Sequence, residues 1–279
     1  MSITTAMIKE LRDATSLGIA DCKKALTQTD GDFDAAIKIL REKGAAVAAK
    51  RASKEANEGK VEAVVTDDYQ QAAMIEVNCE TDFVTRNEDF QGFVAELIDD
   101  ALNHESGTMA EAVSTKVEEK TAQVGEKISV RRNEKWTVED TGAIASYIHM
   151  GGKVGVLLEL ACDKAESVNS AEFQELAKDL TLHVAAAAPE YLSRDDVPAE
   201  QVEGEKEIFR KQLEGKPENI IDNILVGKVN KYFSQICFLE QGFVKEEKQS
   251  ITDLIAEKGK ALGDSISVKR YVRFQLGGE

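Results

Sequence analysis

The sequence has few of the residues that mark membrane, secreted or metal-binding proteins. Its 279 residues include only 3 Pro, 3 His, 4 Cys and 1 Trp. No run approaches the ~20 consecutive apolar residues of a membrane helix, and the N-terminal residues alternate apolar and charged side chains, unlike a secretory signal. No two cysteines have C-x-x-C spacing and the His do not cluster with them, so neither a metal site nor a disulfide framework is expected. These absences predict a cytoplasmic protein with free thiols and without a cofactor, a metal ion or a membrane span.

The sequence motifs of common enzyme classes are also missing. No G-x-G-x-x-G, G-x-S-x-G or H-E-x-x-H occurs, and no Gly-Lys pair is followed by the Ser or Thr that a P-loop requires. The carboxylates are scattered in a way that is typical of solvated helix faces. The residues by themselves therefore predict a binding or regulatory protein that acts through a surface, not an enzyme.

Basic residues are in the minority, with 35 Lys and Arg against 51 Asp and Glu, so the net charge is −16. This balance argues against direct nucleic-acid binding, which needs concentrated Lys and Arg. The hydrophobic fraction of 42% excludes a disordered chain. Residues 1–54 hold 10 basic and 7 acidic residues, a net charge of +3, which leaves −19 for the rest. A mildly basic N-terminal module on an acidic body is expected.

Three short helices are predicted in the N-terminal module. Apolar residues from Ile3 to Leu11 recur at helical spacing, and a second helical run covers 19–26. A third helix is expected from Phe33 to Leu40, with Asp32 as its N-cap and Gly44 just beyond its end. The turn at residues 17–19 either exposes an apolar edge for a partner or closes the small core, with equal weight. Residues 45–54 are expected to form a helical linker, followed by a domain boundary at 55–60.

The body contains an internal repeat. A shift of 83 residues places 75–79 (IEVNC) on 158–162 (LELAC), and a shift of 138 places 125–132 (GEKISVRR) on 263–270 (GDSISVKR). Each unit is predicted to form a hairpin of two strands, a long helix, a shorter helix and a closing strand, with helices on one face of an antiparallel sheet. The predicted fold class is therefore α+β, with a core of two duplicated α/β units.

The two shifts differ by about 55 residues, which predicts an insertion in the second unit, at about 189–250. Residues 198–214 and 217–233 are expected to form two antiparallel helices, each starting near a Pro and separated by a break at 215–217. The predicted organisation is a three-helix module with its linker at 1–54, a first unit at 55–140 and a second unit at 141–279 that this helical hairpin interrupts.

Differences between the repeats indicate functional residues. Cys79 and Cys162 occupy equivalent strand positions, so both are expected to be core residues. Beyond them, the first copy has Phe83 where the second has small or charged residues. Phe83 is expected either to project as a partner contact or to fold back under the following helix. In the second hairpin, His149 is expected at the tip of a turn that contains two Gly, either as a contact or simply solvated.

Three segments together resemble the translation elongation factor Ts family. They are 8–12 with 21–26 (IKELR and DCKKAL), 78–84 (NCETDFV) and 149–157 (HMGGKVGVL). In this order and spacing the resemblance extends over essentially the whole chain. It implies an N-terminal domain similar to ubiquitin-associated (UBA) domains, a duplicated core and a coiled-coil hairpin, in agreement with the organisation above.

The resemblance also implies a function. Members of the family are guanine-nucleotide exchange factors for the GTPase elongation factor Tu: they bind its GDP form, disturb its Mg²⁺ site and promote GDP release so that GTP can bind. The segment matching Thr81, Asp82, Phe83 and Val84 would enter the nucleotide domain of Tu, with Phe83 as the wedge. The other implied partner contacts are Leu17, Ile19, Asp21, Lys23, His149, Met150, Gly151 and Gly152.

Two other classes of function remain as alternatives. The three-helix module could serve an adaptor that binds a ubiquitin-like or helical partner, or the two core units could enclose an enzyme site of an unrecognised type. The hairpin leaves open a homodimer of Tu complexes, an added Tu contact or a site for another partner.

Overall fold

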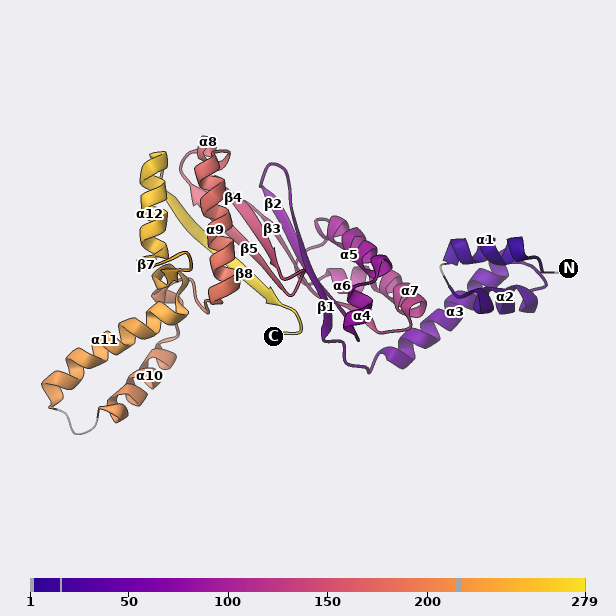
Figure 1. The fold of residues 1–279 in the computed structure, drawn as a ribbon, viewed down its shortest axis with the longest axis horizontal. Coiled ribbons are helices and arrows are strands. Elements are labelled where there is room, and N and C mark those ends of the chain that lie inside the picture. The colour runs from indigo at the N-terminus through magenta and orange to yellow at the C-terminus, as the bar shows by residue number, and fades with distance from the viewer. Residues whose placement is uncertain (1–2, 16, 214–216, 279) are drawn as a thin grey trace.

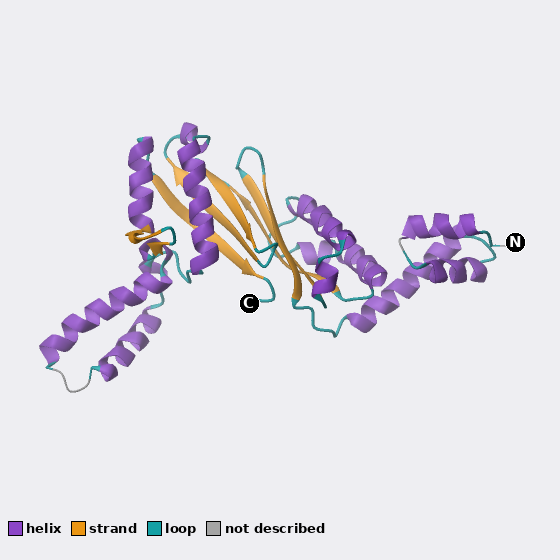
Figure 2. Ribbon diagram, viewed as in Figure 1, coloured by secondary structure: helices purple, strands orange, loops and turns teal. Residues whose placement is uncertain are grey.

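The computed structural model of the protein describes residues 3–15, 17–213 and 217–278. Three parts follow one another along its long axis (Figure 1): helices α1 to α3 at one end, sheets flanked by helices in the middle, and a helical hairpin at the other end. Figure 2 shows that the strands are confined to the middle part and its border with the hairpin. The α+β class expected from the sequence is confirmed. Among the described helices, none is both long enough and apolar enough to cross a membrane.

The N-terminal helices enclose a small core of their own. Leu11, Leu26 and Leu40 are almost fully buried, one from each helix. The carboxylate of Asp32 accepts a hydrogen bond from the backbone N–H of Ala35 at 3.0 Å, which confirms the N-cap predicted from the sequence. The helices are α1 (Thr5–Thr15), α2 (Ile19–Gln28) and α3 (Phe33–Arg51).

The predicted end of the third helix at Gly44 is wrong, because α3 continues to Arg51. Gly44 faces helix α7 (Ser114–Val124), and a Cβ atom at this position would lie only 3.1 Å from the Cβ of Ala122. The missing side chain lets α3 approach α7 closely, and this contact outweighs the weak helix preference of glycine. The residues expected to form a linker thus belong to one continuous helix that joins the N-terminal bundle to the body.

Two three-stranded antiparallel sheets form the middle part, and both have the same order, with the second strand of the hairpin in the centre. Their pairing matches at a spacing of 83 residues: Gly59 pairs with Asn78, and Gly142 with Ala161. In both central strands the pairing register with the third strand shifts directly after a buried Glu, Glu76 in the first sheet and Glu159 in the second. The strands are β1 (Glu58–Val65), β2 (Gln71–Cys79) and β3 (Ile128–Thr137) in the first sheet, and β4 (Gly142–His149), β5 (Val154–Cys162) and β8 (Ile266–Gln275) in the second.

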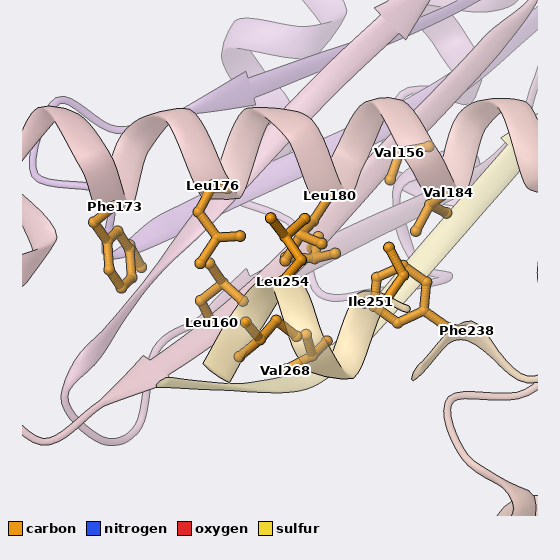
Figure 3. Packing of buried hydrophobic residues seen from close by; sticks show 14 of the residues in the cluster. Val156, Leu160, Phe173, Leu176, Leu180, Val184, Phe238, Ile251, Leu254 and Val268 are labelled. Atoms are coloured by element: carbon orange, nitrogen blue, oxygen red, sulfur yellow. The ribbon is translucent and has the colours of Figure 1, made fainter. Parts of the chain in front are cut away.

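Helices cover the outer face of each sheet. Figure 3 shows how Phe173, Leu180 and Val184 point from α9 toward the second sheet. In the first sheet, Ile75 and Val77 pack against α5 in the same way. The helices are α4 (Asp82–Thr85), α5 (Glu88–Ala101), α6 (Met109–Ala112) and α7 on the first sheet, and α8 (Ala165–Val168), α9 (Ala171–Ala187) and α12 (Ile251–Leu262) on the second.

The sequence predicted helices on one face of each sheet, but the other face is buried as well, because the two sheets pack against each other. Met74 and Trp136 of the first sheet share a cluster with Leu157 and Phe274 of the second. The central strands β2 and β5 accordingly have almost continuous apolar runs without alternation, which is typical of strands buried on both sides. The order of layers is helices, sheet, sheet, helices.

In each sheet a buried Glu pairs with a partly exposed Arg, whose guanidinium lies against an aromatic ring of the other sheet. The Nε of Arg132 lies 2.8 Å from the carboxylate of Glu76, which is fully buried, and the guanidinium is 4.1 Å from the ring centre of Phe274. In the second sheet, Arg270 Nε lies 2.7 Å from the Glu159 carboxylate and its guanidinium 4.3 Å from the ring centre of Trp136. The reciprocal pairs link the two sheets.

The segment predicted to be an insertion forms a projecting hairpin with the two helices expected from the sequence, and the predicted break at 215–217 lies mostly outside the described residues. Leu225, Val229 and Phe233 are buried in a cluster separate from that of the sheets. A two-stranded ribbon that the sequence did not predict connects the hairpin to α12. The elements are η1 (Arg194–Asp196), α10 (Ala199–Gln212), α11 (Glu218–Ile236), η2 (Phe238–Glu240), β6 (Gly242–Phe243) and β7 (Glu246–Ser250).

His183 fixes the base of this insertion to α9. Its ring is fully buried; Nδ1 accepts a hydrogen bond from the backbone N–H of Val244 at 3.3 Å, so Nε2 carries the proton and donates to Gln241 Oε1 at 2.9 Å. Burial lowers the pKa of His183 below its ordinary value of 6.5, and the hydrogen bond with Gln241 opposes this only in part.

We expect this His to make the protein less stable in mild acid. As the pH falls below 6.5, the unfolded chain takes up a proton at His183 while the folded chain does not, so the free energy of unfolding falls. One proton gives a slope of at most about 1.4 kcal/mol per pH unit. Urea titrations between pH 7.5 and 5 on the wild type and on His183→Gln would isolate this contribution. Identical pH slopes for the two proteins would contradict it.

Candidate functional site

The turn after β2 carries the largest of the exposed apolar side chains in the part of the chain that the structure describes. β2 ends at the buried Cys79, and the four-residue helix α4 follows. Phe83 on α4 is 78% exposed, whereas its neighbour Val84 is half-buried and packs against the cluster under α5. Of the two alternatives that the sequence left open, the projecting side chain is the one observed. An exposed aromatic on a well-packed scaffold is typical of a partner contact.

The two residues before Phe83 are bound to the scaffold. The backbone N–H and the hydroxyl of Thr81 both donate to the carboxylate of Glu126, at 3.0 and 2.8 Å. Asp82 accepts from the guanidinium of Arg86 at 2.7 Å, one turn further along. Thr81 is therefore an anchor of the turn, and Asp82 is a half-buried residue in a local ion pair.

The second turn lies between β4 and β5, and the structure corrects the position predicted for His149. His149 is the last residue of β4, half-buried, with Nδ1 2.9 Å from the hydroxyl of Tyr147. The tip consists of Met150 and Gly151, and Met150 is 73% exposed. The exposed apolar side chain of this turn is thus Met150, because pairing with Val154 keeps His149 in the strand.

Gly152 has a structural reason to be glycine. Its φ is +101°, and a Cβ atom here would lie 2.3 Å from Cγ of Lys60. Its carbonyl accepts a hydrogen bond from the N–H of Val61 at 2.8 Å, so the turn is attached to β1 of the first sheet. Gly152 is buried, and this contact explains it without a partner.

The N-terminal residues divide into exposed and structural ones. Ile19 at the start of α2 is 58% exposed, and Lys23 is exposed on the same helix. Leu17 is half-buried and packs against the core of the bundle. The carboxylate of Asp21 pairs with the ammonium of Lys43 on α3. The apolar edge that the sequence predicted at 17–19 is thus represented by Ile19, whereas Leu17 closes the core.

β1 brings two of these three regions together. Its first residue, Glu58, pairs with Cys79 just before the Phe83 turn, and its carboxylate lies 2.6 Å from the Nζ of Lys153 in the His149 turn. Helix α2, which begins at Ile19, lies apart from both, in the bundle at one end of the molecule (Figure 1). Phe83 and Met150 therefore flank the start of one strand, and the N-terminal module offers a separate contact.

The chemistry of the four cysteines agrees with a core role. All four are buried and none forms a disulfide. Burial, helped by the nearby charge of Glu126, raises the pKa of Cys79 to about 12, and burial raises the pKa of Cys237 to about 11. These thiols stay protonated near neutral pH. Within the described residues, no group of three or more His, Cys, Asp or Glu could hold a metal ion.

Sequence reasoning missed Glu126 and Glu80 as residues that support the Phe83 turn. The repeat contained a signal, because Glu126 aligns with Asp264. Asp264 has the same role in the second sheet: it accepts hydrogen bonds from the N–H groups of Asp163 and Lys164, just after the central strand, at 3.1 and 3.3 Å. An acidic residue repeated at the same place beyond a Gly indicated a shared anchor.

Known proteins are similar to this chain over nearly its whole length. A family model described as elongation factor TS matches residues 80–278, from the Phe83 turn onward. The elongation factor Ts proteins of Clostridium perfringens (strain SM101) and Clostridium botulinum (strain Alaska E43) are 43% and 44% identical to this chain, over 99% of the chain and 93% of each relative. The elongation factor Ts of Nautilia profundicola is 40% identical over the same shares.

Proposed function

The chain belongs to the elongation factor Ts family, and from this we propose that it releases nucleotide from elongation factor Tu by inserting the Phe83 turn into its partner. Members of the family are nucleotide exchange factors for Tu in translation elongation. The chain is therefore a non-catalytic exchange factor that acts in the cytoplasm on a protein partner.

The single observation that carries the proposed mechanism is the 78% exposure of Phe83. Mg²⁺ in GTPases bridges phosphate oxygens and neutralises much of their charge, so a wedge that disturbs the Mg²⁺ site weakens nucleotide binding. A factor that binds the nucleotide-free state most tightly must lower the affinity for nucleotide by its coupling free energy, and nucleotide lowers the affinity for the factor by the same amount. Such a mechanism needs no general acid, base or nucleophile in this chain.

The neighbours of Phe83 have supporting roles in this proposal. Thr81 holds the base of the turn, Val84 anchors its far side in the core, and Asp82 is a half-buried carboxylate beside the wedge. His149, Met150 and Gly151 form a second contact with the nucleotide domain of Tu, close to the first along β1. Ile19, with Lys23 and Asp21, forms a third from the N-terminal module, while Leu17 and Gly152 act through the shape of these regions.

We also propose the finer organisation that the sequence predicted. In this scheme residues 1–54 are a UBA-like bundle with its joining helix, 55–140 and 141–279 are duplicated units, and about 189–250 is an insertion. The matching strand orders and registers support duplication. Ile208 and Val226 on the hairpin are exposed, which suits this element to a contact with a protein surface, either of Tu or of a second copy of the complex.

The direct test of the function is release of a fluorescent GDP from Tu of the same source, with and without this protein. We expect the protein to accelerate GDP release in proportion to its concentration. Excess inorganic Mg²⁺ should suppress this acceleration. A release rate that stays at the spontaneous value at all concentrations would contradict the function.

The second contact leads to a prediction for His149→Ala. Loss of an interface side chain outside the energetic centre costs about 1 kcal/mol, so affinity for nucleotide-free Tu should fall several-fold. Because His149 is half-buried and its imidazole bonds to the hydroxyl of the nearby Tyr147, the melting temperature should change little. Titration calorimetry measures the affinity, and Tyr147→Phe is the control that keeps the imidazole but removes its hydrogen bond. Unchanged affinity of His149→Ala would show that this side chain does not contribute to the contact with Tu.

A further inference from the structure

We infer that Glu126 and Glu80 are positioning residues for nucleotide exchange: together they fix the direction in which Phe83 projects. The inference rests on the proposed role of Phe83 and adds the residues through which the fold holds it. Neither carboxylate needs to touch the partner.

The Phe83 turn cannot orient itself. Helix α4 has only four residues, and no side chain caps its N-terminus, since the hydroxyl of Thr81 is engaged elsewhere. So short a helix is not stable alone. Phe83 is mostly exposed, so its own packing does not hold it either. Its direction therefore depends on what fixes the backbone on each side, which is Val84 in the core downstream and residues 80–81 upstream.

Glu126 is the first of the two upstream anchors. Its two carboxylate oxygens accept separate hydrogen bonds, from the N–H of Thr81 at 3.0 Å and from its hydroxyl at 2.8 Å. Hydrogen bonds to a charged acceptor are short and strong, and a pair of them to one residue also fixes its rotation. Glu126 stands at the junction of α7 and β3, so this contact ties the turn to rigid elements of the first unit.

Glu80 completes the anchor in the opposite direction. Its carboxylate accepts from the backbone N–H of Lys127 at 2.6 Å and from the guanidinium of Arg51 at 3.0 Å. Residues 80–81 and 126–127 thus bind each other reciprocally. Arg51 is the last residue of α3, and the Nζ of Lys127 donates to the carbonyls of Ala52 and Lys54 at 2.8 and 2.9 Å. The same cluster therefore connects the wedge to the helix that carries the N-terminal module.

The second unit provides a natural control. Asp264 matches Glu126 and accepts hydrogen bonds from the N–H groups of Asp163 and Lys164 and from the hydroxyl of Ser167. Helix α8 behind this anchor carries no exposed aromatic residue. Both anchors support a turn of the fold, but only the first supports a wedge. Loss of either should weaken folding, and only loss of the first should slow exchange.

The test compares stimulated GDP release by Glu126→Ala and Asp264→Ala at equal fractions folded. We expect Glu126→Ala to slow release about 5-fold or more, and Asp264→Ala to stay within about 2-fold of wild type. In the Phe83→Ala background, Glu126→Ala should add less than about 2-fold, because residues that act through one group are not additive. Glu126→Gln should recover most of the rate, since its amide can accept from the Thr81 N–H and donate to the hydroxyl.

Three results would overturn the inference: release by Glu126→Ala at the wild-type rate, an equal slowing by Asp264→Ala, or a full additional loss in the Phe83→Ala background. If Glu126→Ala does not fold, Thr81→Val, which removes one of the two hydrogen bonds and keeps the side-chain shape, must slow release in its place. The proposed function fails separately, by a wild-type rate of Phe83→Ala itself. A slow Phe83→Ala with a fast Glu126→Ala would leave that function intact and exclude only the positioning role.

Discussion

Replacing Phe83 by Ala is expected to slow stimulated GDP release from Tu by at least ~10-fold, which corresponds to about 1.4 kcal/mol of lost coupling. The ring is 78% exposed and the second unit folds without an aromatic at this place, so the melting temperature should stay close to that of the wild type. Stopped-flow release of fluorescent GDP gives the rate, and circular dichroism the stability. Asp82→Ala should have a smaller effect, because this carboxylate lies beside the wedge and is paired with Arg86.

The control for Phe83→Ala is Phe90→Ala on α5. Phe90 is fully buried, so its truncation should cost ~3–5 kcal/mol of stability, the usual penalty for a core aromatic. Chelation of Mg²⁺ should narrow the difference in rate between Phe83→Ala and wild type if displacement of the ion is part of the mechanism. A Phe83→Ala protein that is unfolded, or that exchanges nucleotide at the wild-type rate, would remove this residue from the mechanism.

Replacing Arg132 by Met is expected to lower the free energy of unfolding by about 3–5 kcal/mol, because it removes the close charged partner of a buried carboxylate and leaves only the guanidinium of Arg131, 4.0 Å away, among the described residues. Glu76 is fully buried between the sheets, and its other hydrogen bonds come from the Gly277 N–H at 2.8 Å and the Asn78 amide at 3.1 Å. These neutral donors do not replace a guanidinium at 2.8 Å. Met keeps an apolar stem over Phe274, so the loss reports mainly on the charge.

The equivalent pair in the second sheet is the matched control. Glu159 is slightly exposed and the side chain of Arg270 is 43% exposed, so water can solvate what remains. Arg270→Met should therefore cost less than Arg132→Met, closer to the ~1 kcal/mol of solvent-exposed pairs. The double variant Arg132→Met with Glu76→Gln should recover most of the lost stability, because no buried charge is left. Chemical denaturation of the variants gives their free energies of unfolding. Equal losses of stability for Arg132→Met and Arg270→Met would show that the burial of Glu76 does not set the cost.

The parts of this protein that depend on local or repeated patterns could be predicted from the sequence alone. Asp32 caps α3 because a short acidic side chain before a helical run has a donor within reach. The two sheets have matching registers because the same apolar spacing occurs 83 residues apart. The helices of the hairpin follow from the apolar stripes between Pro198 and Ile236. The Phe83 turn was identified as a difference between two otherwise equivalent segments.

Contacts between distant segments decided the rest. Helix α3 continues past Gly44 because the missing side chain lets the helix pack closely against Ala122, which lies far along the chain. Phe83 projects because Val84, not the aromatic ring, fills the space under α5. Glu126 reaches Thr81 across 45 residues, and Glu80 reaches Lys127 across 47. Such pairs leave no periodic signal, since hydrogen bonds between side chains and a distant backbone depend on where whole elements come to lie, and only the packed sheets and helices fix that.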